Sequence, residues 1–240
     1  MFMLDDSAIS IATHYWTNHL GCAAGELFSE PLRIITHGPD LADYHGVFAL
    51  FREGAAIVSL PPQHADALRP LLAGLAKDCS PDALATALQS AAAVVVGPAY
   101  IGYATKVALP EHPVRALNPE DIPALHEFQQ KCNPTEWEHG GSGTENSCSG
   151  VFVDGKLVAV AGYEIWGGKI AHVLIITHPD HRGNGFARSA VAHLAARAID
   201  AGLLPQYRTL ESNRASIRIA ETLGFHPYAR SLAVRLSTNV

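Results

Sequence analysis

The C-terminal half of the chain has apolar runs of strand length that alternate with amphipathic segments of helix length. The Asp154-Gly155 pair separates two of these runs, and Asp-Gly between alternating apolar residues is a strong hairpin signal. Antiparallel strands followed by strand–helix–strand order predict an α/β fold with a mixed sheet. The predicted strands are 114–117, 150–153, 157–165, 170–177, 204–210 and 228–236, and the predicted helices are 118–132, 186–201 and 214–223.

The N-terminal half has a similar but less regular pattern. Apolar runs predict strands at 43–51 and 55–60, and leucines on one face predict a helix over 62–77. Ser80, followed directly by a proline, predicts a capped helix that runs to about residue 90. The three valines at 94–96 predict a short buried strand. This half contains no motif that carries chemistry.

Composition narrows the function classes. The chain has 240 residues, of which 48% are hydrophobic and 17% charged, as in an ordinary globular protein. A net charge of −6 argues against a general nucleic-acid binder. Four cysteines with no paired spacing favour reduced thiols. No apolar run approaches ~20 residues and no basic-then-apolar leader opens the chain, so we expect a cytoplasmic protein without membrane contact.

The charge is divided unevenly along the chain. Prolines cluster around Pro113, and we place the boundary there: an N-terminal α/β subdomain at 1–112 and a second domain at 113–240. The first part holds five basic and eleven acidic residues, and the second holds twelve of each. Residues 182–218 contain six arginines against two acidic residues, which suggests a polyanionic ligand. A solvated helix face carrying arginines would give the same count.

A strand, a tight turn and a helix follow one another between residues 170 and 201. Gly183 and Gly185 in the turn allow the backbone to approach a ligand closely. The first N–H groups of a helix have no partner within the helix and form a phosphate site, to which Arg182 adds a positive charge. A glycine turn alone would also serve as a plain strand-to-helix connection. It is neither a P-loop nor a three-glycine dinucleotide fingerprint.

Three motifs in order resemble one family. The Arg-x-x-Gly-x-Ala at 182–187 matches the Arg/Gln-x-x-Gly-x-Gly/Ala signature of the GNAT superfamily of N-acetyltransferases. Asn-x-x-Ser at 213–216, followed by Leu-Gly-Phe at 223–225, is similar to the closing helix motif, and 114–121 is similar to the opening of the family. The resemblance covers about 113–240. It implies a GNAT-like mixed, mostly antiparallel sheet with splayed central strands flanked by helices.

The resemblance also implies a site for acetyl-CoA, used as the acyl donor. The pantetheine arm would pair with the strand at 170–177 where it separates from the strand at 204–210, and an N–H near Ile176 would meet the thioester oxygen. The pyrophosphate would lie on the amides after Arg182. The implied binding residues are Ile175, Ile176, Thr177, Arg182, Gly183, Asn184, Gly185, Phe186, Ala187 and Asn213.

Direct attack of an amine on the thioester requires a base that accepts a proton. Three residues are candidates for this catalytic role: Glu164, His172 and Glu211. Each has an ordinary alternative. Glu164 would equally be a solvent-facing strand residue, His172 a core histidine, and Glu211 an acid favoured at a helix start.

A polar segment at 133–149 is predicted to be a loop. A Trp, a His and carboxylates among glycines suit a clamp for a cationic amine, although an exposed flexible loop would have the same composition. The substrate-binding candidates are Glu136, Trp137, Glu138 and His139, with Glu145 further on. His178 and His181 lie in a turn and no metal motif is present, so we expect no metal.

The family often has a tyrosine acid where this chain has Ala220. We therefore weigh two functions: an N-acetyltransferase acting on a primary amine of a small molecule, and a non-catalytic acyl-CoA sensor or regulatory module. Residues 1–112 are also considered as a degenerate second copy of the fold. The sequence leaves the acceptor open, and a homodimer is one of the allowed oligomeric states.

Overall fold

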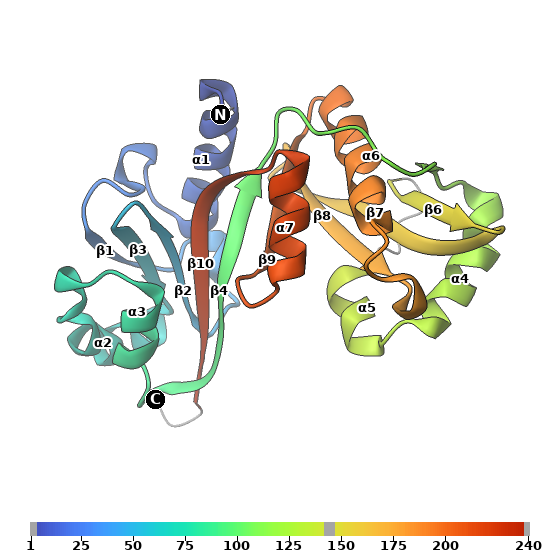
Figure 1. Cartoon of the computed structure of the whole chain (residues 1–240). Helices are drawn as coiled ribbons and strands as arrows, with labels where there is room; N and C mark the ends of the chain where they lie inside the picture. Colours follow the sequence, from blue (N-terminus) through green and yellow to red (C-terminus); the bar gives the residue numbers. More distant parts are fainter. Residues whose placement is uncertain (1–3, 142–146, 238–240) are drawn as a thin grey trace. The chain divides into compact units, whose positions relative to one another are not determined.

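The computed structural model describes residues 4–141 and 147–237 (Figure 1). The chain forms two compact units, each assembled from separate stretches. The first unit contains Met1–Ala8, Tyr103–Tyr207 and Ala215–His226, and the second contains Ile9–Gly102, Arg208–Arg214 and Pro227–Val240. Both units therefore draw on both halves of the chain. The boundary suggested at Pro113 stays a prediction, as does the idea of a second copy of the fold.

The strands of the first unit follow the order β9-β8-β7-β6-β5. All neighbouring pairs are antiparallel except β8 and β9, which are parallel. The sheet is thus mixed and mostly antiparallel, as expected. The strands are β5 (Arg115–Ala116), β6 (Ser149–Val153), β7 (Lys156–Trp166), β8 (Ile170–Thr177) and β9 (Leu204–Leu210), of which the last three residues of β9 belong to the second unit.

The helices of this unit begin and end close to the predicted positions, with one exception. Residues 134–140, predicted to lie in a loop, form a short helix instead. Asn133 caps it by accepting from the N–H of Thr135 at 2.9 Å, and Pro134 occupies its first position. The helical elements are η6 (Pro119–Asp121), α4 (Ile122–Lys131), α5 (Pro134–Gly140), η7 (Pro179–His181), α6 (Phe186–Asp200) and α7 (Arg214–Leu223).

Helices cover both faces of the strands β6 to β8. On one face, Ser149 Oγ of β6 lies 2.8 Å from Nδ1 of His193 on α6. On the other face, Val160 of β7 and Ile176 of β8 join an apolar cluster with Phe128 of α4 and with Trp137 of α5. Because side chains alternate along a strand, the even-numbered residues of β7 and β8 share the face of α4 and α5.

The second unit is also α/β, with the strand order β1-β3-β2-β10-β4. Its core joins the strands to the short helices after β3 through buried leucines and valines. β10 pairs antiparallel with β2, so the last strand of the chain is built into this unit. The elements are α1 (Asp6–Leu20), β1 (Leu32–Thr36), β2 (Val47–Arg52), β3 (Ala55–Leu60), α2 (Ala65–Leu68), α3 (Pro81–Ala87), β4 (Ala92–Tyr103) and β10 (His226–Leu236).

Two predictions for the N-terminal half were wrong. The segment 62–77 is not one helix but α2 between three short 3₁₀ turns, because Pro70 lacks an N–H and Gly74 weakens a helix. The valines at 94–96 do lie in a strand, but they are 40–47% exposed rather than buried. An apolar run identifies a strand without deciding whether anything packs on it. Across the described residues, no helix has the length and apolarity needed to cross a membrane.

Candidate active site

The loop between β8 and α6 (residues 178–185, the glycine loop) is built to present N–H groups. Gly183 and Gly185 have φ values of +80° and +79°, which are strained for any other residue. A Cβ added to Gly183 would meet no atom within 4 Å, so the space over the loop is open. Asn184 Nδ2 donates to the carbonyl oxygens of His181 and Arg182 at 3.2 and 3.3 Å. These bonds occupy carbonyl groups of the loop, so its N–H groups suit an anion.

Two arginines stand beside this loop, each held by a carboxylate. Arg182 Nη2 donates to Glu136 of α5 at 2.6 Å, and both side chains are about half exposed. Arg188, in the first turn of α6, pairs with Glu111, while its buried Nε has no hydrogen-bond partner. An added Cβ at Gly185 would lie 3.6 Å from Arg188 Nη2. The loop therefore has positive charge next to the helix N-terminus, as a diphosphate requires.

His112 supports the same loop from the preceding segment. Its Nε2 donates to the carbonyl of Asn184 at 2.8 Å, and its ring packs on Phe186 with centroids 4.7 Å apart. Ser189 Oγ accepts from the N–H of His112 at 3.0 Å, which fixes the segment on α6. His112, Glu111 and Arg188 were missed as site residues by sequence reasoning, since no motif marks them.

β8 has an unpaired backbone edge where it approaches the glycine loop. Its register with β9 ends at the pair His172 and Gln206, five residues before the end of β8 at Thr177. The N–H of His178 donates to the carbonyl of Val158 at 2.9 Å. Since backbone groups alternate in direction along a strand, the N–H and C=O groups of the even-numbered residues of β8 face β7. The odd-numbered groups, those of Val173, Ile175 and Thr177, face the other edge. This is the splay of central strands expected from the resemblance.

The alternation has a consequence for one predicted residue. Ile176 lies opposite Val160 in the β7–β8 register, and its backbone groups face β7. Its N–H is thus directed away from the open edge, whereas that of Ile175 is directed into it. Thr177, the last residue of the open edge, is half-buried like Ile175.

Two of the three base candidates come together on the α4/α5 face of the sheet. Glu164 of β7 lies directly opposite His172 of β8. The indole of Trp166 stacks on the His172 ring, with centroids 3.8 Å apart and planes 14° apart, and Trp166 Nε1 donates to Glu164 at 3.1 Å. His172 is half-buried and Glu164 exposed. On the other side, His172 Nδ1 lies 3.0 Å from Gln206 Oε1.

Glu211 and Asn213 are found in the second unit. The carboxylate of Glu211 forms a two-bonded ion pair with Arg230, whose Nη2 lies 2.7 Å from Oε2. Both carboxylate oxygens of Glu211 are thus occupied by one guanidinium. The N–H of Asn213 donates to the carbonyl of Leu210 at 2.9 Å. Ala220 of α7, at the position of the family's tyrosine, is fully buried.

The substrate candidates of α5 have different surroundings. Glu136 is engaged by Arg182, and Trp137 packs against Phe128 with ring centroids 6.2 Å apart. Glu138 and His139 are exposed. An added Cβ at Gly140, the last residue of α5, would lie 2.7 Å from the carbonyl oxygen of Ile175. Glu145 lies outside the described residues.

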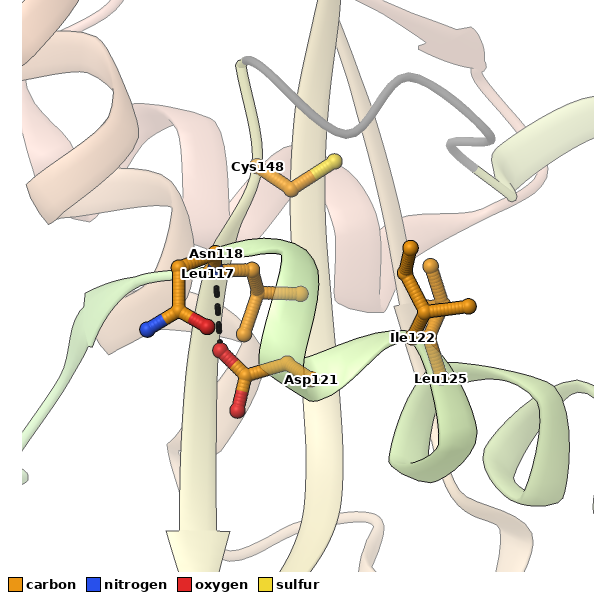
Figure 2. A pocket seen from close by; sticks show the side chains of 6 residues that line it. All are labelled: Leu117, Asn118, Asp121, Ile122, Leu125 and Cys148. Atoms are coloured by element: carbon orange, nitrogen blue, oxygen red, sulfur yellow. Dashed lines mark hydrogen bonds between the residues drawn. The ribbon is translucent and has the colours of Figure 1, made fainter.

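A separate hollow opens beside η6 and α4 (Figure 2). Its lining is mainly apolar and also includes Asp121 and Asn118. Asp121 accepts two hydrogen bonds of 2.6 Å from Arg115 and one of 2.9 Å from the N–H of Asn118. The guanidinium of Arg115 lowers the pKa of Asp121. Because the carboxylate is fully engaged, we interpret this hollow as structural.

Metal and thiol chemistry have little support. Within 4–141 and 147–237, no three His, Cys, Asp or Glu side chains are grouped as metal ligands. Burial raises the pKa of the Cys132 thiol, which disfavours a catalytic thiolate. The expectation that the protein uses no metal stays a prediction.

Comparisons with known proteins point to one family. Residues 114–225 match the model of the acetyltransferase (GNAT) family. An acetyltransferase from the GNAT family of Colwellia psychrerythraea has the same fold, with a TM-score of 0.55 and 15% identity over 98% of both chains.

Two further solved structures are similar over part of the chain. A GNAT-family protein from Novosphingobium aromaticivorans is 26% identical over 61% of this chain and 67% of its own, with a TM-score of 0.47. A GCN5-related N-acetyltransferase-like protein from Streptococcus suis is 14% identical over 80% of this chain and 84% of its own, with a TM-score of 0.48. No curated protein matches. By the family match, residues 114–225 of this chain form a domain of the GNAT acetyltransferase family.

Proposed function

We propose that the chain is an acetyl-CoA-dependent N-acetyltransferase that acetylates a primary amine of a small molecule. One observation carries the proposal: within the acetyltransferase domain, the unpaired edge of β8 leads directly into the glycine loop at the N-terminus of α6. An open strand edge suits the amides of a pantetheine arm, and helix N–H groups suit a diphosphate.

The residues present fit this donor. The N–H groups of 183–187 would hold the diphosphate, with Arg182 and Arg188 beside them. The backbone groups of Ile175 and Thr177, which lie beyond the last pair with β9, would pair with the pantetheine amides. When bound, acetyl-CoA supplies a thioester. The amine nitrogen bonds to its carbonyl carbon and the C–S bond breaks. The proton lost by nitrogen goes to the base, and the sulfur leaves as a thiolate that takes its proton from water.

The oxyanion donor is reassigned in this proposal from Ile176 to Ile175. The Ile176 N–H faces β7, and the Ile175 N–H faces the open edge. A backbone N–H fixed by a strand is preorganised, so it stabilises developing negative charge without rearranging.

His172 is the base that we favour. It is the last residue of β8 in register with β9, at the start of the open edge. Imidazole is also the side chain whose ordinary titration lies nearest neutral pH. Glu164 opposite it would stabilise the protonated ring. The ion pair with Arg230 makes Glu211 the least suitable of the three candidates.

The acceptor is a cationic small molecule in this proposal. Glu138 on α5 and Glu164 on β7 belong to the face of the sheet that carries His172, and both are exposed carboxylates that attract an ammonium group. The reaction needs neither a metal nor a nucleic acid. The free cysteines fit the reducing cytoplasm, where we place the protein.

The test is thiol release from acetyl-CoA with a panel of small amines. We expect turnover with at least one cationic amine, and His172→Gln should lower kcat by about 10²–10⁴-fold because a general base contributes that much. Silence across the panel while acetyl-CoA still binds would contradict the enzymatic proposal.

A second candidate function is an acyl-CoA sensor without catalysis. The observation in its favour is Ala220, fully buried where the family often has its acid. In the enzymatic proposal the thiolate takes its proton from water. Tight binding of acetyl-CoA with no turnover for any amine would favour the sensor.

A further inference from the structure

We propose that Gln206 is a positioning residue that fixes the tautomer and the orientation of the His172 ring. The inference rests on the proposed function of His172 as a base. Gln206 lies on β9, opposite His172, and is fully buried. Its Oε1 lies 3.0 Å from His172 Nδ1, and its Nε2 donates to the Tyr103 hydroxyl at 2.7 Å.

The direction of these bonds determines where the imidazole proton sits. The amide group of Gln206 has one accepting end and one donating end. Because its donating end is directed to the hydroxyl of Tyr103, its oxygen faces His172. An amide oxygen only accepts, so the neutral imidazole carries its proton on Nδ1. Nε2 is then the nitrogen that takes a proton from the amine, directly or through a bonded neighbour.

The contacts around the His172 ring also restrict its orientation. Trp166 covers one face of the ring, and Gln206 fixes it in its plane. Two titratable groups of the first unit flank it: Glu164 across the β7–β8 pair and Tyr103 behind Gln206. A buried glutamine bonded to both a histidine and a tyrosine is costly unless every bond is made, which explains a rigid arrangement.

The experiment combines nitrogen NMR with kinetics on the full chain. In ¹⁵N-histidine-labelled protein, the His172 ring should show Nδ1 protonated and Nε2 unprotonated in the neutral state. Gln206→Leu should lose this single tautomer and lower kcat by about 10–100-fold, while the KM for acetyl-CoA changes less than about twofold, because only the base is affected.

A carboxylate at this position provides a conservative comparison. In Gln206→Glu, Oε still accepts from Nδ1, and the Tyr103 hydroxyl can donate to it. Its negative charge stabilises the imidazolium, so the acid limb of kcat/KM should move to higher pH. The matched control is Ser149→Ala, which removes the same kind of bond to Nδ1 of His193 on the other face of the sheet. That variant should leave both the His172 signals and the pH profile unchanged.

The outcomes separate the two proposals. An Nε2-protonated ring in the wild type, or an unchanged ring in Gln206→Leu, would overturn the role of Gln206 whatever the activity. If the wild type shows the fixed Nδ1 tautomer but His172→Gln keeps full activity, the role of Gln206 in holding the ring stands and His172 is refuted as the base.

Discussion

At the scale of the residue, the candidate site depends on backbone conformations that few side chains tolerate. Gly183 and Gly185 both lie in the left-handed region, where a Cβ costs about 1–2 kcal/mol. The two positions differ in space: Gly183 is open, whereas Gly185 faces Nε2 of His112 at 3.3 Å from an added Cβ. Gly185 thus serves two purposes, the turn itself and the approach of His112.

Gly185→Ala should destabilise the protein by about 1–2 kcal/mol. It should also weaken acetyl-CoA binding about tenfold or more, because a shift of the glycine loop misplaces its N–H groups. Calorimetry with acetyl-CoA and urea unfolding measure the two effects. Gly155→Ala is the matched control: its φ is +76° and no atom lies within 4 Å of its added Cβ. It should show the same strain with unchanged affinity. Equal affinities of the two variants for acetyl-CoA would contradict the role of the glycine loop in binding it.

Asp121→Asn should lower the free energy of unfolding by about 1–3 kcal/mol at pH 7, since it breaks the charged pair with the half-exposed Arg115. The pKa of Asp121 is lowered by Arg115, so the folded state favours the charged form. This contribution is present above the ordinary value of 3.8 and is lost as pH falls through the lowered pKa.

Urea unfolding at pH 7 and at low pH checks this prediction. The difference between wild type and Asp121→Asn should shrink on acidification. Asp180→Asn, at a carboxylate that is 86% exposed, should change stability little at either pH. A constant difference across the pH range would contradict the role of the charge.

At the scale of the element, the short helix α5 brings the substrate candidates to the β8 edge. Its Glu136 holds Arg182 of the glycine loop, and its last residue, Gly140, touches the Ile175 carbonyl. α5 thus contacts both the expected diphosphate region and the expected pantetheine region. It lacks bulk at Gly140 because the strand backbone lies there.

Gly140→Ala should destabilise the protein by about 1–3 kcal/mol and raise the KM for acetyl-CoA, because a Cβ 2.7 Å from the Ile175 oxygen forces α5 or β8 to move. Thermal unfolding and steady-state kinetics test it. Gly74→Ala, where an added Cβ meets nothing, is the control. If the two variants had the same stability and the same KM, the contact of α5 with β8 would not matter.

At the scale of the whole molecule, half-buried histidines make stability sensitive to mild acid. Burial lowers the pKa of His19, His37 and His193 below the ordinary 6.5. The unfolded chain then binds more protons than the folded one as pH falls below 6.5, so acid favours unfolding. The stabilisation is complete above pH 6.5 and is lost on going down toward the folded pKa values.

Unfolding free energies measured between pH 7.5 and about 5 should therefore fall with pH, since the unfolded-state value of histidine lies within this range. His37→Asn should flatten the slope, while its stability at pH 7.5 drops from loss of the bonds to Ser59 and Gly46. An unchanged slope in that variant would refute the assignment to His37.

The regular half of the chain was predictable from sequence because its signals are local. The β6–β7 turn, the bounds of β8, β9 and α7, and the start of α6 follow from Asp-Gly, glycines and apolar runs. Predictions failed where two local signals conflict. In the segment 62–77 the leucines on one face predict a helix, whereas Pro70 interrupts it. The helix α1 was missed although Ala8, Ala12, Trp16 and Leu20 are buried at four-residue spacing.

The candidate site was only partly predictable. A motif marks Arg182 and the glycines, so the donor site was accessible from sequence. Gln206, Tyr103 and Trp166 meet His172 only through strand pairing, and one sequence does not give the register between distant strands. The pairing of Glu211 with Arg230 was hidden for the same reason.

The central claim is that the amides after Arg182 and the free edge of β8 hold acetyl-CoA. Titration of ¹⁵N-labelled protein with acetyl-CoA, followed by amide chemical shifts, tests it residue by residue. The account predicts the largest shifts at the N–H groups of 183–187 and of Ile175 and Thr177, beyond the last β8 residue that pairs with β9. No shifts in these amides at saturating acetyl-CoA, or shifts confined to other strands, would contradict it.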